Sequence, residues 1–356
     1  MDAPANTRPP REAHRIDEAR LAAWLGAHVP GCGGGAAQVL QVKGGQSNPT
    51  YWVGVRGPEG EVELVVRKKP PGKLLPSAHA VEREYRVMRA LRGTAVPVPD
   101  ALALCEDDAV IGTPFFVMRW MPNRIFWDAT LPELAEPADR RALYAEYVRV
   151  LAAIHRVDYA GVGLGDYGRV GGFVARQLER WTKQYAASRT AHVAPMEALI
   201  AWLGANLPAD DETSLVHGDY RLDNIMFAPD GERAIGVLDW ELSTLGHPLS
   251  DLAYACLAYH IALPGRGSLA GVDVAALGIP TEDEVVAEYL RLTGRGPIDR
   301  TWPFFLAFGI FRLAAIAQGV YARSLQGNAS SEDASSFGAA VELLASLACR
   351  IAGVQV

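Results

Sequence analysis

The hydrophobic pattern of this chain changes near Pro122, and that change constrains the fold more than any other feature of the sequence. Before Pro122, short runs rich in β-branched and aromatic residues are bounded by Gly, Pro and Asp, which is typical of β-strands. These predicted strands are residues 39–43, 51–55, 62–67 and 115–120. Residues 79–91 carry apolar side chains at helical spacing and predict one inserted helix. An antiparallel sheet with one helix is an α+β lobe.

After Pro122 the pattern is mainly helical, so the sequence predicts a second lobe made mostly of helices. Helices are expected at residues 173–185 and 196–203 and from Pro248 onward. Two short strand-like runs interrupt them at 225–227 and 234–238. The Pro-Asp-Gly sequence at 229–231 is a turn signal, so these two runs predict a β-hairpin. The expected fold class is therefore α+β with two lobes.

The first 36 residues extend the N-terminal lobe. Residues 1–15 are polar and Pro-rich, and we expect them to be disordered. Asp17 can cap a short helix whose apolar stripe contains Leu21, Trp24 and Leu25. The chain is thus expected to divide into the extension at 1–36, an N-terminal lobe at 37–121 and a C-terminal lobe at 122–356.

Composition narrows the class of protein. The chain has 356 residues, 49% of them hydrophobic and 21% charged, as expected of a globular protein with a sizeable core. Its formal net charge of -7 gives no support to nucleic-acid binding. Its four cysteines are far apart, so no zinc site is expected. We find no signal-peptide pattern, and the apolar run 302–317 contains Arg312. We therefore expect residues 302–317 to form a buried helix and not a membrane span. We also expect a cytoplasmic protein with no membrane partner.

One segment of the C-terminal lobe combines two carboxylates and an amide in a pattern suited to phosphoryl transfer. Asn224 follows Asp219 of His217-Gly-Asp219 by five positions, and Asp239 ends the second strand of the predicted hairpin. Magnesium prefers oxygen ligands and takes only a few from protein, and Asn224 and Asp239 can supply them. Asp219 is then free to orient a substrate hydroxyl, and Arg221 can approach the transferred phosphate.

These residues resemble the signature of a known superfamily. His217-Gly-Asp219 with Asn224, followed by Leu238-Asp-Trp-Glu241, is similar to the aminoglycoside-phosphotransferase and choline-kinase superfamily. The resemblance extends from residue 37 to the C-terminal end. It implies a two-lobed protein-kinase-like fold, with ATP and Mg²⁺ as cofactors and a small-molecule hydroxyl as acceptor. It also implies that Asp219 is the catalytic base and that Asn224 and Asp239 hold the magnesium.

The same resemblance implies that the N-terminal lobe binds the nucleotide. A glycine-rich loop follows the first predicted strand, and its backbone N–H groups would face the ATP phosphates. This loop contains Gly44, Gly45, Gln46, Ser47 and Asn48. Residues 116–121 are similar to the hinge that hydrogen-bonds adenine, which places Arg119, Trp120 and Met121 at the nucleotide.

The third predicted strand departs from the protein-kinase pattern. Arg67 stands where a lysine is expected, and a planar guanidinium can hold a phosphate and a carboxylate together. Lys68 follows directly, so the sequence leaves the register open by one residue. Glu84 on the next helix is the expected partner, with Glu82, on the other side of that helix, as the alternative. The basic stretch 68–73 is either a solvated loop or a positively charged segment that attracts an anionic substrate.

Longer stretches resemble one subgroup of the superfamily. Residues 45–51, 67–79, 217–224 and 244–251 are together similar to kinase domains fused to some acyl-CoA dehydrogenases and to their bacterial stand-alone relatives. That resemblance implies phosphorylation of a hydroxyacyl-CoA or hydroxy acid. Two alternatives stay open: an aminoglycoside or amino-alcohol kinase, whose site should be rich in carboxylates, and a non-catalytic nucleotide-binding regulator. The absence of an Ala-Pro-Glu sequence after Asp239 favours a small-molecule acceptor over a protein.

Some polar residues near these motifs have structural explanations. We expect His217 to brace the catalytic loop by hydrogen bonds and His155 to be a hydrogen-bonded core residue. Asp251 is expected to cap a helix or brace the same loop, and Asp223 to cap a turn or touch a second magnesium. Arg312 lies in an apolar helix and needs an anion, either a carboxylate such as Asp251 or an anionic group of the substrate.

Overall fold

The computed structural model describes residues 3–33, 35–43, 48–70, 80–262, 267–298, 300–326 and 337–356. The chain forms two compact units. The first contains Met1–Ile125 and Asn224–Leu242, and the second contains Phe126–Asp223 and Ser243–Val356. Each unit has its own core and is described by itself.

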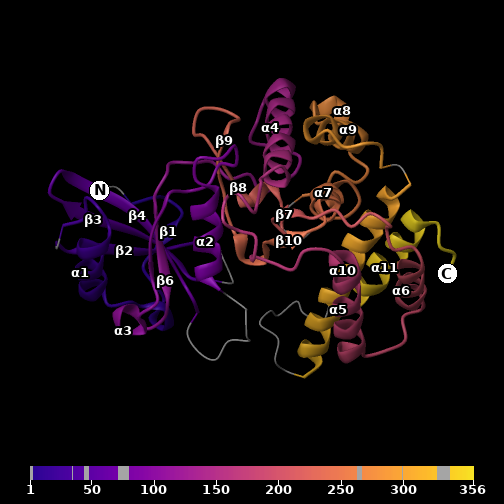
Figure 1. Cartoon of the computed structure of the whole chain (residues 1–356), viewed down its shortest axis with the longest axis horizontal. Coiled ribbons are helices and arrows are strands. Elements are labelled where there is room, and N and C mark those ends of the chain that lie inside the picture. The colour runs from indigo at the N-terminus through magenta and orange to yellow at the C-terminus, as the bar shows by residue number, and fades with distance from the viewer. Residues whose placement is uncertain are drawn as a thin grey trace. The chain divides into compact units, whose positions relative to one another are not determined.

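The first unit is built on a six-stranded antiparallel sheet, coloured indigo to purple in Figure 1. Its strand order is β1-β2-β3-β4-β6-β5. The strands are β1 (Thr7–Arg8), β2 (Ala37–Val42), β3 (Thr50–Gly57), β4 (Gly60–Lys68), β5 (Ala101–Cys105) and β6 (Phe115–Arg119). All four strands predicted in this region are confirmed, with ends shifted by at most two residues. β5 was not predicted, because its sequence Ala-Leu-Ala-Leu-Cys has few β-branched residues and pairing with β6 decides its conformation.

Three helices accompany this sheet. α1 (Glu18–His28) begins as predicted, because the Asp17 side chain accepts a hydrogen bond from the Arg20 backbone N–H at 3.0 Å. It buries Leu21 and Leu25 in the core under the sheet. α2 (Val81–Leu91) follows β4, and the short α3 (Asp108–Ile111) precedes β6.

The prediction that residues 1–15 are disordered was wrong over the part that the structure describes. This segment adds β1 to the edge of the sheet and forms a short 3₁₀ turn, η1 (Glu12–His14). The hydroxyl of the buried Tyr51 donates to the backbone carbonyl of His14 at 2.6 Å. Pairing with β2 and this buried hydrogen bond order the segment, although its polar composition does not predict an ordered structure.

The predicted β-hairpin is confirmed and is part of the first unit. It consists of β8 (Ile225–Phe227) and β9 (Ala234–Val237), followed by the short turn η3 (Trp240–Leu242). Backbone bonds tie it to the rest of the unit, among them Val237 N–H to the Pro97 carbonyl at 2.9 Å. The domain boundaries expected from the sequence remain a prediction, since they describe functional lobes rather than compact units.

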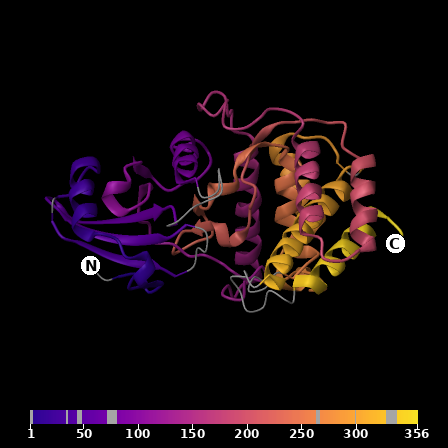
Figure 2. The same ribbon diagram turned by 90° about the horizontal axis from the view of Figure 1, so that it is seen from below.

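The second unit is mainly helical, as predicted. Figure 2 shows its long helices, with the C-terminal pair α10 and α11 side by side. Its helices are α4 (Pro137–His155), α5 (Phe173–Ser188), α6 (Ala194–Ala205), α7 (Pro248–Cys256), α8 (Val274–Leu277), α9 (Glu282–Thr293), α10 (Trp302–Leu325) and α11 (Phe337–Ala352). A two-stranded antiparallel ribbon of β7 (Ser214–Val216) and β10 (Thr244–Gly246) lies between α6 and α7 in the sequence.

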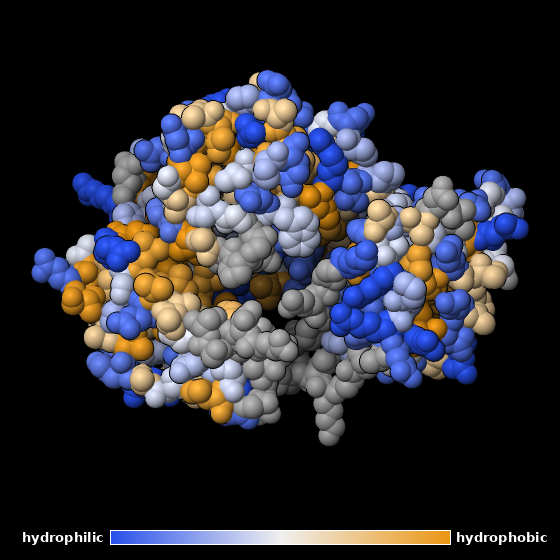
Figure 3. All heavy atoms as spheres, turned by 180° about the vertical axis from the view of Figure 1, so that it is seen from behind, coloured by the Kyte–Doolittle hydropathy of each residue, from blue (hydrophilic) through white to orange (hydrophobic). Residues whose placement is uncertain are grey.

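α10 is a long and apolar helix. It is long and apolar enough to cross a membrane, but 72% of its most apolar window is buried inside the structure. Its neighbours are α5, α7 and α11. The prediction of a buried helix is therefore confirmed, and its length reflects core packing. On the face drawn in Figure 3, hydrophobic residues form patches among hydrophilic ones.

Candidate active site

A charged cluster lies at the end of the hairpin in the first unit. Arg67, near the end of β4, contacts Glu84 of α2, with 2.9 Å between Nε and Oε2. Its Nη2 also contacts Oδ1 of Asp239 at 2.7 Å. The prediction that Glu84 is the partner of Arg67 is confirmed. One planar guanidinium thus holds two carboxylates that come from distant parts of the sequence.

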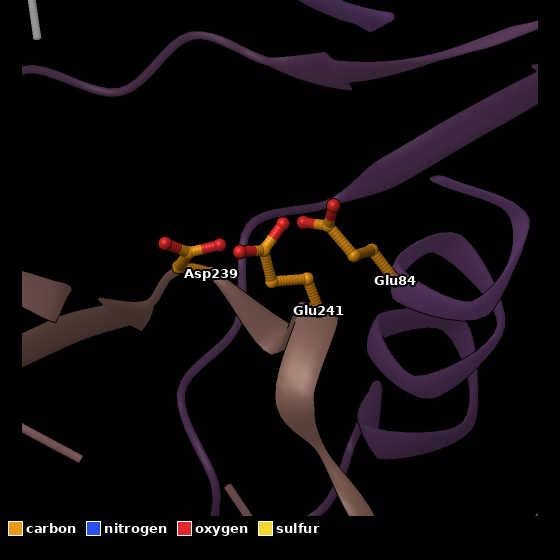
Figure 4. A group of neighbouring side chains, drawn as sticks. All are labelled: Glu84, Asp239 and Glu241. Atoms are coloured by element: carbon orange, nitrogen blue, oxygen red, sulfur yellow. The ribbon is translucent and has the colours of Figure 1, made fainter. Parts of the chain in front are cut away.

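A third carboxylate, that of Glu241, completes this cluster. Figure 4 shows Glu84 extending from α2 and Glu241 from the turn after β9, with their carboxylates directed toward that of Asp239. Each of the three residues offers one oxygen, and these oxygens lie within 4.8 Å of one another. Asn48, which is fully buried, donates through Nδ2 to Glu84 at 2.9 Å and to Glu241 at 3.5 Å.

The electrostatics of this cluster favour an additional cation. Burial, with the charges of Asp239 and Glu241 added to it, raises the pKa of Glu84 to about 7, although Arg67 opposes the shift. Burial by itself would lower the pKa of Arg67, but Glu84 and Asp239 outweigh burial and raise it. One guanidinium faces three carboxylates, so negative charge is in excess. Carboxylate oxygens are the ligands that Mg²⁺ prefers, and this donor set fits that ion.

A backbone hydrogen bond brings together the two residues predicted to hold magnesium, Asn224 and Asp239. The N–H of Leu238 donates to the carbonyl of Asn224 at 2.8 Å, which places Asn224 beside the residue that precedes Asp239. Asp239 has a φ of 62°, a left-handed conformation that is uncommon for a residue other than glycine. The chain turns sharply here, between β9 and η3, and Trp240 is fully buried.

The structure answers the register question of the third predicted strand. Lys68 is buried, and its ammonium group donates to the carbonyl of Ile111 at 3.0 Å. Lys69 pairs with Glu82 at 2.7 Å, so that glutamate takes no part in the Arg67 pair. Arg67 is therefore the basic residue of β4 that belongs to the charged cluster. The basic stretch beyond residue 70 lies outside the described residues.

Two further parts of the expected nucleotide site have different outcomes. Gly44, Gly45, Gln46 and Ser47 lie outside the described residues, so the predicted phosphate loop stays a prediction apart from Asn48.

In the expected hinge, Arg119 ends β6, and its backbone N–H donates to the Asp100 carbonyl at 3.0 Å. The Trp120 N–H donates to the Glu63 carbonyl at 3.1 Å, and Met121 follows in an irregular stretch. Contact of these residues with adenine remains a prediction.

In the second unit, the Asp251 side chain hydrogen-bonds to the turn that carries Asp219. The buried Asp251 carboxylate accepts the backbone N–H groups of His217 at 2.5 Å and of Gly218 at 2.9 Å. Gly218 has a φ of 83°, which suits glycine and permits the sharp turn before Asp219. The Nδ1 atom of His217 accepts the Asp219 N–H at 3.3 Å. Both side chains brace this turn, as predicted.

A second histidine supports the same aspartate. His155, at the end of α4, lies 3.4 Å from Asp251 through Nε2 and 2.6 Å from the Tyr289 hydroxyl through Nδ1. Burial lowers the pKa of His155, which favours the neutral ring. Burial by itself would raise the pKa of Asp251, but its hydrogen bond and charge interaction with His155 hold it below the ordinary value. The expectation of a hydrogen-bonded core histidine is confirmed.

Asp219 itself is held by two side chains. Arg221 Nη2 lies 2.9 Å from Asp219 Oδ2, and Arg221 Nε lies 3.5 Å from Asp223. The side chain of Tyr254, on α7, lies close enough to Asp219 for the two groups to interact electrostatically. Burial, followed by the Asp219 charge, raises the pKa of Tyr254, so its hydroxyl stays protonated. These contacts orient the carboxylate that the sequence predicts as the base.

Two of these residues were absent from the predicted site. Glu241 was noted only as part of the motif after Asp239, although its spacing of two residues is a usable signal for a second ligand. Tyr254 follows Asp251 by three positions, which puts both on one face of α7. Only the packing of α7 against the Asp219 turn shows that this tyrosine reaches the carboxylate.

The prediction that Asp251 is the partner of Arg312 was wrong. Asp251 instead accepts the two backbone N–H groups of the turn. Arg312 Nη1 donates to the carbonyl of Gly218 at 2.9 Å. Backbone donors reach the buried carboxylate directly, so it needs no guanidinium.

A pocket opens beside Arg221 within the second unit. It is partly open to solvent and is lined by apolar side chains with a few polar groups, as small-molecule sites are. Arg221, Asp223 and Tyr254 supply its polar rim. Its apolar wall includes Trp127, Tyr144, Leu257, Tyr259, Ile261 and Leu269.

Comparison with known proteins identifies the family. Residues 38–290 match the family described as phosphotransferase enzyme family. The chain belongs to this family. It is also 47% identical to acyl-CoA dehydrogenase family member 10 of Mus musculus over 345 residues, which are 96% of this chain and 32% of that protein. The chain therefore spans about a third of the length of that curated relative.

Solved structures place this phosphotransferase-family chain in the protein-kinase-like fold. A crystal structure of a candidate aminoglycoside phosphotransferase from Ralstonia eutropha is similar with a TM-score of 0.85 and 47% identity, over 95% of this chain and 99% of that one. Choline kinase from Cryptosporidium parvum matches with a TM-score of 0.65 and 10% identity, over 94% and 96% of the two chains. The second likeness shows the fold alone. The two-lobed α+β fold expected from the sequence is confirmed.

Proposed function

We propose that this protein is an ATP-dependent small-molecule kinase that transfers the γ-phosphate to a substrate hydroxyl. The carrying observation is the fixed position of Asp219. Two contacts on its side chain orient it, and the Asp251 carboxylate holds the turn beneath it. A carboxylate so placed can accept a hydrogen bond from an alcohol and orient its oxygen for attack. The family membership supports the same reaction class.

The residues divide the chemistry between them. Asp219 takes the hydroxyl proton as the oxygen attacks the γ-phosphorus and the bond from phosphorus to the bridging oxygen breaks. Arg221, beside it, can contribute positive charge toward the phosphoryl oxygens. Arg67 can contact the phosphates, while Glu84 fixes its direction. Asn224, Asp239 and Glu241 would hold magnesium, which when bound neutralises phosphate charge.

The acceptor that we propose is a hydroxyacyl-CoA or a hydroxy acid. The pocket beside Arg221 has a wall of aromatic and aliphatic side chains that suits a short acyl chain. Among the lining residues that the structure describes, the only carboxylate is Asp223, which already faces Arg221. An aminoglycoside or amino alcohol carries positive charge and would be better served by several free carboxylates. The curated relative named as an acyl-CoA dehydrogenase family member supports an acyl acceptor.

An assay of ATP consumption, with mass detection of the product, tests this proposal. The acceptor panel contains 3- and 4-hydroxyacyl-CoAs, the free hydroxy acids, choline, homoserine and kanamycin. We expect turnover of the acyl class and its loss in Asp219→Asn. Turnover of choline or kanamycin alone would reverse the acceptor assignment. Tight binding of magnesium-ATP without turnover of any acceptor would favour the regulator instead.

A further inference from the structure

Arg312 is a cation without a carboxylate partner in the part of the chain that the structure describes. It lies in the middle of α10, where most neighbouring positions are apolar and buried. Its Nη1 donates to the Gly218 carbonyl at 2.9 Å, and no carboxylate oxygen of the described residues lies within 4.0 Å of the guanidinium. Its Nε is buried and has no hydrogen-bond partner among those residues. An arginine so placed has unused capacity to bind oxygen.

Two aromatic rings fix the direction of this guanidinium. Its Cζ atom lies 5.7 Å from the ring centre of Trp181 and 5.4 Å from that of Tyr254. Cation–π contacts hold a guanidinium in place but leave its N–H groups available in the plane. Arg221 is different, because its charge is already matched by Asp219 and Asp223.

Arg312 also lies close to the predicted base. It donates to the carbonyl of Gly218, the residue before Asp219. It lies over the ring of Tyr254, a residue whose pKa is raised in part by the neighbouring charge of Asp219. Tyr254 further lines the apolar pocket. An acceptor whose hydroxyl is at Asp219 therefore lies near Arg312, although Arg312 is not among the described residues that line the pocket.

We propose that Arg312 binds the carboxyl oxygen of the acceptor. This inference rests on the proposed kinase function and narrows it to substrates recognised at their carboxyl end. A free carboxylate and a thioester carbonyl share this chemistry, since both offer an oxygen to guanidinium N–H groups. The carboxylate adds charge attraction, so it gains more from Arg312 than the carbonyl does. An acceptor recognised through an amine has nothing to bind there.

Three matched acceptors test this role. They are 4-hydroxybutyrate, its CoA thioester and 1,4-butanediol, which keeps the chain and hydroxyl but lacks the carboxyl group. For the wild-type protein we expect the KM of the diol to exceed that of the better carboxyl acceptor by about tenfold or more, as one charge-assisted hydrogen bond is lost. Arg312→Gln should raise the KM of that acceptor about tenfold and leave kcat/KM for the diol within about threefold. The form with the higher kcat/KM in the wild-type protein identifies the natural acceptor.

Two further variants separate recognition from folding. Arg312→Lys keeps the charge and should recover part of the affinity for the acid. Arg323→Gln changes an exposed arginine on the same helix and should change nothing. The proposal is overturned if Arg312→Gln lowers kcat/KM equally for the diol and the carboxyl acceptors, because Arg312 would then act only through Gly218.

A binding measurement keeps this test separate from that of the kinase activity. Titration of 4-hydroxybutyrate and of its thioester, with magnesium and a non-hydrolysable ATP analogue present, needs no turnover. Binding that Arg312→Gln abolishes supports the assignment even if no phosphate is transferred, in which case the kinase proposal alone fails. Failure of both compounds to bind, or equal binding by wild type and Arg312→Gln, overturns the assignment whatever the protein does with ATP.

Discussion

Arg67 Nη2 lies 2.7 Å from Asp239 Oδ1, so an arginine contacts the carboxylate that is predicted to hold magnesium. The same guanidinium contacts Glu84, and the three residues form one electrostatic unit. A magnesium ion bound as proposed would therefore compete with Arg67 for Asp239. This relationship depends on arginine, because the compact ammonium group of a lysine lacks the fork that spans two carboxylates.

Replacing Arg67 by methionine should separate metal binding from nucleotide use. Loss of the competing positive charge is expected to strengthen the binding of Mn²⁺ alone by about threefold to tenfold, while kcat/KM for ATP falls by about 100-fold. Calorimetric titration and steady-state kinetics measure the two effects. Lys69→Met is the control, because Lys69 pairs with Glu82 outside the cluster. Unchanged Mn²⁺ affinity in Arg67→Met would contradict the competition.

Glu241 should contribute to metal binding although it lies outside the set predicted from the sequence. We expect Glu241→Gln to weaken Mn²⁺ binding by about tenfold, because one anionic ligand or ligand-orienting group is lost. Manganese relaxation measurements with and without ATP report this directly. Glu82→Gln, on α2 like Glu84 but outside the cluster, is expected to bind as the wild type does. If both variants bind equally well, Glu241 has no part in the site.

Asp219 should act in the chemical step and not in nucleotide binding. Asp219→Asn is expected to lower kcat by about 10²–10⁴-fold, the usual contribution of a positioned general base. The dissociation constant of magnesium-ATP should stay within about twofold. Asp230→Asn, in the exposed turn of the hairpin, should leave both quantities unchanged. A variant that loses ATP affinity together with activity would point to a structural role for Asp219.

Asp251 should matter for folding more than any other carboxylate of the Asp219 turn. Asp251→Ala leaves two backbone N–H groups without their acceptor and removes the partner of His155. We expect a loss of about 3–5 kcal/mol in the free energy of unfolding, as for other broken buried pairs. Urea denaturation followed by fluorescence measures it, with Asp230→Ala as the control. A loss below about 1 kcal/mol would mean that water replaces the carboxylate.

His155 should make the folded protein sensitive to acid. Burial lowers its pKa below the ordinary value of 6.5, so the unfolded chain takes up a proton there before the folded protein does. The stabilisation is complete above pH 6.5 and is lost as the pH falls through the lowered pKa. Asp251, whose pKa is also lowered, adds to the loss in the same direction below its ordinary value of 3.8. Thermal unfolding midpoints measured between pH 8 and pH 4 report the loss of stability caused by protonation of His155.

A histidine variant tests that assignment. His155→Gln should show a flatter dependence of the midpoint on pH between 6.5 and 5, since it has no ring to protonate. His28→Gln changes an exposed histidine of α1 and should keep the wild-type slope. The assignment is wrong if the slope is the same in all three proteins.

Local chemistry made much of the fold predictable. The β-branched runs before Pro122 and the helical spacing after it correspond to real strands and helices, because each pattern reflects a face that must be buried. Asp17 caps α1 as predicted, and the Pro-Asp-Gly turn joins β8 and β9. β1 and β5 escaped prediction, since their residues have weak strand preference and only pairing with β2 and β6 makes them strands.

The order of residues alone predicted Asp219, Asn224 and Asp239 as site residues, because a motif of fixed spacing can be recognised without coordinates. Tertiary packing decided the partners. Arg67, and not Lys68, contacts Glu84 in the charged cluster. The Asp251 carboxylate accepts backbone N–H groups and does not pair with Arg312. Tyr254 lies near Asp219 because α7 packs against the turn that carries it. Side chains far apart in the sequence meet only when helices and strands pack. Which buried charge finds a carboxylate, and which is left without one, is therefore set by the folded structure.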